Sequence, residues 1–111
     1  ERYHLPILVT ENGIGAPDIL EADGKIHDAY RIQFIREHLQ QMRLAITDGV
    51  QILGYCPWAA IDVVSTHQGY RKRYGFIYVD REEFDLKELK RFRKDSFYWY
   101  ANVILENGQN L

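Results

Sequence analysis

The chain has 111 residues, of which 46% are hydrophobic, and its 16 acidic and 14 basic side chains give a formal net charge of −2. This length is sufficient for one small globular domain. Charges of both signs are interspersed, so the composition gives no reason to expect a nucleic-acid partner or binding to an anionic membrane surface.

The single cysteine, Cys56, excludes an internal disulfide. It lies in an apolar run without a histidine or second cysteine at metal-ligand spacing, so we expect a buried, inert thiol and no metal or other cofactor. No apolar run approaches the ~20 residues needed to cross a bilayer, and no secretory signal pattern opens the chain. The expectation is a soluble, cytoplasmic protein.

The first predicted element is a strand within residues 5–13, LPILVTENG, an apolar run that ends abruptly at a carboxylate. The β-branched-rich run Ile7, Leu8 and Val9 predicts a strand buried on both faces of a parallel sheet. Ligands bind at the carboxyl ends of parallel strands, so Glu11 is a candidate catalytic residue. The alternative is that Glu11 only caps a turn.

Residues 14–27 are rich in turn formers and predict a loop, either a wall of a site or a plain solvated connector. Residues 28–47 are the clearest helix, because apolar side chains recur at spacings of three and four. This apolar stripe consists of Ile32, Ile35, Leu39, Met42 and Ile46. His38 lies at its edge and is expected to be a packing or hydrogen-bonded residue. Residues 50–58 then predict a second parallel strand, which completes one right-handed βαβ unit.

Trp58 falls at the carboxyl end of the second strand, the same end as Glu11. An aromatic face there can stack on a sugar ring, and the alternative is a core tryptophan. Residues 61–79 form a long excursion in which Ser65, Lys72 and Tyr74 offer a hydroxyl, an ammonium and a phenol. These three donors can converge on phosphate oxygens. The alternative for the basic run 71–73 is a solvated charged surface.

The remaining sequence predicts a short strand at 76–79, a charged surface return at 81–94 and a final amphipathic helix. The apolar side chains expected to anchor the return on the body are Phe84, Leu86, Leu89 and Phe92. Asp95 and Ser96 are expected to supply the N-cap of the final helix, which the Asn-Gly pair at 107–108 ends.

The motif VTENG at 9–13 resembles the nucleophile motif of the retaining β-glycosidases of glycoside hydrolase family 1. Three later segments resemble the end of those (β/α)8 barrels in order and spacing, namely AITDGVQILGYCPWAAID, STHQGYRKRYGFIYVD and DSFYWYANVI. Four collinear segments are much more specific than one short motif. The resemblance implies an α/β fold in which residues 1–111 are the C-terminal portion of a single TIM barrel domain. This portion holds about the last two βα units, and the N-terminal strands are absent.

The resemblance also implies roles for individual residues. Glu11 would be the nucleophile, and Trp58 would line the sugar subsite. In members acting on plain glucosides, a Glu-Trp pair occupies the positions of Ser65 and Thr66, so Ser65 removes a carboxylate that would repel phosphate. Together with Lys72 and Tyr74, Ser65 points to the 6-phospho-β-glycosidase branch.

Thr66 stands where phospho-β-galactosidases of the family often carry tryptophan, which favours the gluco epimer. The implied reaction is retaining hydrolysis of 6-phospho-β-D-glucosides, such as cellobiose phosphate or aryl phosphoglucosides, to glucose 6-phosphate and the aglycone. The family's acid/base glutamate lies in an Asn-Glu-Pro motif that this sequence lacks. The isolated chain is therefore expected to be inactive without the missing N-terminal barrel segment.

Family barrels also carry a cis peptide bond after the matching tryptophan, which implies one between Trp58 and Ala59. Several alternatives to the 6-phospho-β-glucosidase remain open. They are a plain β-glucosidase or a 6-phospho-β-galactosidase of the same family, a non-catalytic sugar-phosphate-binding module, and a purely structural α/β domain.

Overall fold

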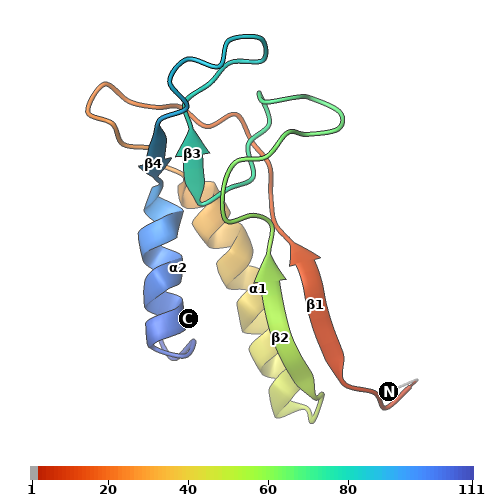
Figure 1. Ribbon diagram of the computed structural model, residues 1–111. Helices are drawn as coiled ribbons and strands as arrows, with labels where there is room; N and C mark the ends of the chain where they lie inside the picture. The colour runs from red at the N-terminus through yellow and green to blue at the C-terminus, as the bar shows by residue number, and fades with distance from the viewer. Residues whose placement is uncertain (1–2) are drawn as a thin grey trace.

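The computed structural model describes residues 3–111, so residues 1–2 of the predicted domain lie outside the described part. In chain order, its elements are β1 (Ile7–Asn12), α1 (Ala29–Thr47), β2 (Ile52–Pro57), β3 (Ile77–Val79), β4 (Arg91–Arg93) and α2 (Asp95–Leu105) (Figure 1). The predicted helix at 28–47 and the predicted strands at 50–58 and 76–79 are confirmed as α1, β2 and β3.

The strands β1 and β2 form a parallel two-stranded sheet, and α1 crosses between them (Figure 1). Parallel strands require such a crossover because a tight turn can only reverse the chain direction. β1 runs further than expected and includes Glu11. Its pairing becomes irregular after Val9 and resumes at Asn12, which pairs with Pro57. The carboxyl ends of both strands therefore meet at one edge of the sheet.

The predicted apolar stripe of α1 faces the core. Ile35 and Leu39 form a buried cluster with Phe76 and with Val103 of α2, whereas Ile46 at the far end of α1 is exposed. Residues three or four apart share one face of a helix, so this stripe packs α1 against α2. Nδ1 of His38 lies 2.7 Å from the Phe34 carbonyl oxygen, which confirms a hydrogen-bonded histidine.

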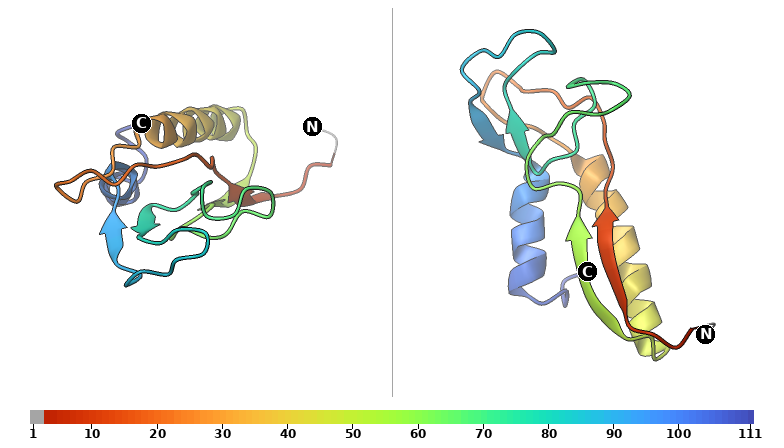
Figure 2. Two further views of the ribbon diagram at one scale, coloured as in Figure 1. Left: turned by 90° about the horizontal axis from the view of Figure 1, so that it is seen from above. Right: turned by 45° about the vertical axis from the view of Figure 1, so that its right-hand side comes forward.

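The expectation that β1 is buried on both faces is wrong for this chain. Ile7 and Leu8 are half exposed, and Leu53 of β2 is 63% exposed. α1 lies along one face of the sheet (Figure 2), and no other helix or strand within residues 3–111 covers the opposite face. Cys56 is exposed as well, so the predicted buried thiol is also wrong. The strands within residues 3–111 form two sheets of two strands each and no closed barrel.

The predicted N-cap of the final helix is also wrong. α2 already begins at Asp95, its N-cap position is Lys94, and neither supplies a capping side-chain bond. Instead, the buried carboxylate of Asp28, just before α1, accepts hydrogen bonds from the Ser96 backbone N–H at 2.9 Å and from the Ser96 hydroxyl. The first turn of α2 is thus capped by a residue 68 positions earlier in the chain. The end of α2 is as predicted, with Asn107 and Gly108 at positive φ after the last turn.

The return between β3 and β4 is held by charges. Phe84 is 99% exposed and Leu86 is 55% exposed, so the prediction that they anchor on the body is wrong. The ammonium of Lys87 instead bridges the carboxylates of Asp80 and Glu82 at 2.9 and 3.1 Å. The other two predicted anchors, Leu89 and Phe92, are partly buried. Among residues 3–111, neither helix is long and apolar enough to cross a membrane.

Candidate active site

Five of the predicted site residues line one cavity of about 280 Å³ at the carboxyl ends of β1 and β2. They are Glu11, Trp58, Ser65, Thr66 and Tyr74, and Gly13 and Val64 complete the lining. The Trp58 backbone N–H donates to the Asn12 carbonyl at 2.8 Å, which extends the strand pairing to the cavity rim. Because both strands end here, a carboxylate from β1 and an indole ring after β2 face the same space.

Two glycines allow the close approach of the chain around this cavity. A side chain at Gly13 would collide with the Trp58 carbonyl, and one at Gly15 would meet Cε1 of Tyr74 at 2.6 Å and Cε of Lys72 at 2.8 Å. Glycine is needed where backbone must pass this close to other atoms. The peptide bond between Trp58 and Ala59 is cis, as the resemblance implied.

A hydrogen bond from Tyr55 holds the end of β1. The Tyr55 hydroxyl donates to Oδ1 of Asn12 at 2.6 Å, and burial raises the pKa of this phenol to about 12. Tyr55 therefore stays neutral and keeps its donor proton at physiological pH. Since Asn12 is the neighbour of Glu11, this bond fixes the backbone that carries the candidate nucleophile.

Ser65 lies in a tight turn that orients its hydroxyl. The Ser65 oxygen accepts from the backbone N–H groups of His67 and Gln68, both at 3.3 Å. A pair of backbone bonds between Ser65 and Gly69, each 3.0 Å long, closes the turn. With the oxygen engaged as an acceptor, the hydroxyl still has one proton to donate within the cavity, where Tyr74 lies close by.

Lys72 is the sixth predicted site residue and lies beside the cavity. Its ammonium nitrogen is 5.3 Å from the centroid of the Tyr74 ring. Hydrogen bonding from Ser65, followed by the effect of Lys72, lowers the pKa of the Tyr74 phenol, while the charge of Glu11 acts in the opposite direction. The donors of Ser65, Lys72 and Tyr74 are thus close enough to influence one another, and such a set suits an anionic oxygen ligand.

The structure contains a buried ion network that the sequence pattern did not indicate. Two of its residues belong to the excursion 61–79. Three aspartates and three basic residues compose it, namely Asp18, Asp28, Asp62, Arg31, Arg73 and Lys94. Nζ of Lys94 lies 2.5 Å from Oδ2 of Asp18 and 2.7 Å from Oδ1 of Asp62. Burial, with the nearby Arg31, lowers the pKa of Lys94, and the two carboxylates oppose this shift. The three positive charges balance the three negative ones, as burial of charges requires.

This network corrects two interpretations. Arg73 is not part of a solvated basic surface, because it is only 5% exposed, whereas its neighbour Arg71 is exposed as that interpretation expected. Asp18 is not in a plain solvated connector either, since its side chain is fully buried. Local sequence carried no signal for these pairs, because Asp18 and Lys94 are 76 residues apart.

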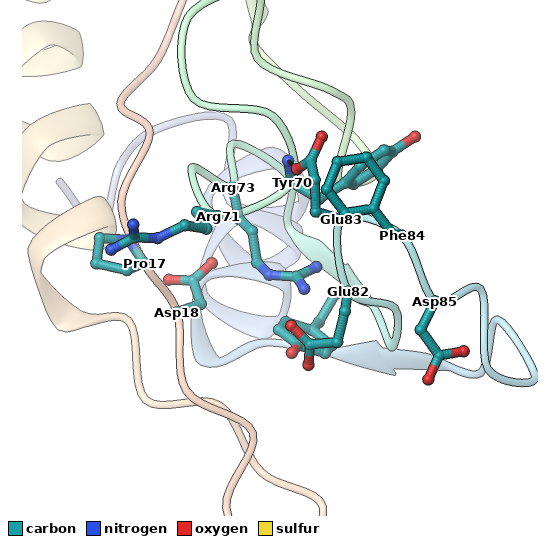
Figure 3. A pocket seen from close by; sticks show the side chains of 10 residues that line it. Pro17, Asp18, Tyr70, Arg71, Arg73, Glu82, Glu83, Phe84 and Asp85 are labelled. Atoms are coloured by element: carbon teal, nitrogen blue, oxygen red, sulfur yellow. Dashed lines mark hydrogen bonds between the residues drawn. The ribbon is translucent and has the colours of Figure 1, made fainter.

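A second cavity of about 590 Å³ is lined by a different set of residues (Figure 3). Arg71 and Arg73 line it together with Asp18 and with Glu82 and Glu83 of the charged return. Glu11 does not line this cavity. The predicted site residues therefore belong to the smaller cavity.

Comparison with known proteins identifies relatives of the whole described segment. The sequence pattern of glycosyl hydrolase family 1 matches residues 1–109. The chain is 53% identical over 110 residues to the aryl-phospho-β-D-glucosidase BglC of Bacillus subtilis, covering 99% of this chain and 23% of that protein. It is 51% identical over 112 residues to a phospho-cellobiase of Klebsiella oxytoca, covering 100% of this chain and 24% of that protein.

Relatives that are named for other activities also match. A 1,4-β-D-glucan glucohydrolase of Thermotoga neapolitana is 43% identical over 102 residues, covering 92% of this chain and 22% of that protein. The solved structure of a family 1 β-glucosidase from Thermotoga maritima with isofagomine lactam superposes with a TM-score of 0.84 at 40% identity. That match covers 93% of this chain and 22% of the other.

The chain spans about a quarter of the length of the curated relatives that it matches. A parallel β1–α1–β2 unit with a carboxylate at its end agrees with one part of a (β/α)8 barrel. The family pattern extends over nearly every residue, and the structural match is equally extensive. The chain therefore belongs to glycosyl hydrolase family 1.

Proposed function

We propose that residues 1–111 are the C-terminal portion of a single barrel domain and supply the nucleophile and phosphate subsite of a retaining 6-phospho-β-glucosidase. The observation that carries this proposal is the cavity in which Glu11 lies together with Trp58, Ser65 and Tyr74. Two relatives with just over 50% sequence identity are named aryl-phospho-β-D-glucosidase and phospho-cellobiase. These names support the same substrate class.

In this proposal the Glu11 carboxylate attacks the anomeric carbon while the bond to the aglycone oxygen breaks. A second carboxylic acid, held about 5–5.5 Å from the nucleophile by the rest of the enzyme, protonates the leaving oxygen. Water then cleaves the glycosyl ester, which releases glucose 6-phosphate and restores the Glu11 carboxylate. The indole of Trp58, on the wall of the cavity, offers a platform for the sugar ring.

The 6-phosphate would bind between Ser65, Lys72 and Tyr74. Ser65 contributes an oriented hydroxyl proton, and Lys72 contributes the opposing charge. A phenol whose pKa is lowered is a better hydrogen-bond donor, so Tyr74 adds a strong neutral contact. Thr66 lies on the same wall without a bulky ring, which supports the gluco over the galacto epimer.

A plain β-glucosidase is the second candidate, because a glucan glucohydrolase and a β-glucosidase are among the matched relatives. The donor set at Ser65, Lys72 and Tyr74 argues against it. A plain glucoside has no dianion to compensate the ammonium and no use for a serine where a carboxylate would accept its hydroxyls.

The test requires a complete barrel. We define the grafted enzyme as BglC of Bacillus subtilis with its matching quarter replaced by residues 1–111, a replacement that 53% identity favours. Glu11→Gln in the grafted enzyme should reduce turnover of p-nitrophenyl β-D-glucoside 6-phosphate by about 10³-fold or more. The amide has nearly the same shape but cannot form the glycosyl ester, so binding of glucose 6-phosphate should persist.

A fluorosugar substrate that traps the ester should label the peptide containing Glu11, as read by mass spectrometry. Glu37→Gln, an exposed glutamate on α1, is the matched control and should leave turnover unchanged. Labelling of another carboxylate, or turnover within about tenfold of the parent by Glu11→Gln, would refute the nucleophile assignment.

A further inference from the structure

Arg73 lies between Lys72 and Tyr74 in the sequence, yet its side chain points into the buried network. Its Nη1 donates to Oδ2 of Asp62 at 3.1 Å and to the Val79 carbonyl at 2.7 Å. Its Nη2 donates to the Arg81 carbonyl at 2.7 Å. One guanidinium therefore connects the excursion to the end of β3 and to the start of the charged return.

The backbone of Arg73 is fixed as well. It forms an antiparallel bridge with Ala16, with hydrogen bonds of 2.9 and 3.0 Å, and its carbonyl also accepts from Nη2 of Arg31 at 2.9 Å. Neighbouring side chains in extended backbone point to opposite faces. With Arg73 directed inward, Lys72 and Tyr74 are directed to the other face, where both approach Gly15.

Asp62 fixes the backbone on the other side of Tyr74. Its Oδ1 accepts from the Gly75 N–H at 2.9 Å, while its Oδ2 accepts from Arg73. Tyr74 is thus held between two residues that share one buried carboxylate. Asp62 is in turn neutralised by Lys94, at 2.7 Å.

From these contacts we propose that Arg73 is a positioning residue for the phosphate subsite. It contacts no substrate itself and keeps Lys72 and Tyr74 in register with Ser65. The inference rests on the proposed function and adds a specificity determinant outside the cavity. Only a guanidinium can reach Asp62 and both carbonyls together, because a lysine ammonium is a single point donor on a flexible stem.

The test is Arg73→Lys in the grafted enzyme. This substitution keeps the charge of the network but removes the two guanidinium nitrogens that donate to Asp62, Val79 and Arg81. KM for p-nitrophenyl β-D-glucoside 6-phosphate should rise by about 10-fold to about 100-fold, because small displacements of binding groups have effects of this size. The value of kcat should change by less than about threefold, and the KM for the unphosphorylated glucoside should stay the same. Arg71→Lys is the matched control, since Arg71 is exposed on the wall of the second cavity (Figure 3) and should leave all values unchanged.

Circular dichroism and thermal unfolding of each variant accompany the kinetics. Equal losses for both substrates in Arg73→Lys, or loss of its folded state, would assign Arg73 to general stability and overturn the inference. An unchanged KM in a folded variant would overturn it as well. If the unsubstituted grafted enzyme shows no preference for the phosphorylated substrate, the proposed function fails, and the inference fails with it.

Discussion

Ser65 illustrates how one residue decides the charge of the cavity. Its oxygen accepts two backbone N–H bonds within the turn, so the group presented to a ligand is a proton donor. A glutamate at this position would present a carboxylate beside Tyr74 and Lys72. Because the donors are close together, a single substitution should change which substrate the cavity prefers.

We expect the substrate preference to respond to both polar partners. Lys72→Ala in the grafted enzyme should weaken phosphorylated substrates by ~1.5–3 kcal/mol, the range for hydrogen bonds to charged groups. Ser65→Glu should go further and reverse the preference, since its carboxylate repels phosphate and accepts from a free sugar hydroxyl. The measurement is the ratio of kcat/KM for phosphorylated over plain glucoside. An unchanged ratio in both variants would refute the phosphate subsite and leave Lys72 as an ordinary surface lysine.

At the scale of elements, the two helices are joined at their amino-terminal ends. Asp28 precedes α1, and its carboxylate binds Ser96 in the first turn of α2 and the guanidinium of Arg31 in α1. Helix N-termini leave unsatisfied N–H groups, and a buried carboxylate both accepts from them and suits the positive end of the helix dipole. Nη2 of Arg31 also donates to the Arg73 carbonyl at 2.9 Å, which connects this junction to the excursion beside the cavity.

Removal of the Ser96 hydroxyl should loosen this junction. Ser96→Ala loses one buried hydrogen bond to Asp28, which should reduce the local opening free energy of α2 by about 1–2 kcal/mol. Hydrogen exchange of the peptide spanning residues 95–105 should then be about 5-fold to about 30-fold faster. Gln33→Ala, which removes only an exposed bond to Glu37 on α1, is the control. Equal exchange in Ser96→Ala and the parent would show that Asp28 does not stabilise α2.

At the scale of the whole molecule, both strands of the β1–β2 sheet carry exposed apolar side chains. Ile7 and Leu8 are about half exposed, and Leu53 is 63% exposed. Exposed apolar side chains that lie together are typical of a surface that other chain segments cover. The relatives are about four times as long as this chain. Both observations agree with a chain that forms part of a larger barrel wall, and in the proposed function the remaining strands would supply the second carboxyl group.

The isolated 111-residue chain should therefore hydrolyse no 6-phospho-β-glucoside. General acid catalysis typically contributes about 10²–10⁴-fold, and the walls that position the substrate would also be absent. The purified chain and the grafted enzyme should be compared at equal concentration with p-nitrophenyl β-D-glucoside 6-phosphate. Turnover by the purified chain alone would contradict this prediction and place an acid catalyst among its own residues.

The sequence by itself predicted both helices, the strands β1, β2 and β3, and most of the residues that line the cavity, but not the short strand β4. Spacings of three and four marked the stripe of α1, and short apolar runs marked β1 and β2, because helices and strands place side chains at fixed periods. A parallel pair with a helical crossover brings its strand ends together, so Glu11 and Trp58 could be placed at one edge in advance. Ser65 and Tyr74 were candidates from their donor groups and Thr66 from the resemblance, and all three line the same cavity.

Only the tertiary structure decided which charges are buried and which apolar faces are exposed. Arg71 and Arg73 look alike in the sequence, yet one is exposed and the other is bound to Asp62 in the buried network. Local periodicity cannot encode such a difference, because the partners come from distant segments, and Lys94 reaches Asp18 across 76 positions. Burial of a strand face likewise depends on what packs over it. Leu53 and Cys56 lie in the apolar run of β2, yet both are exposed here.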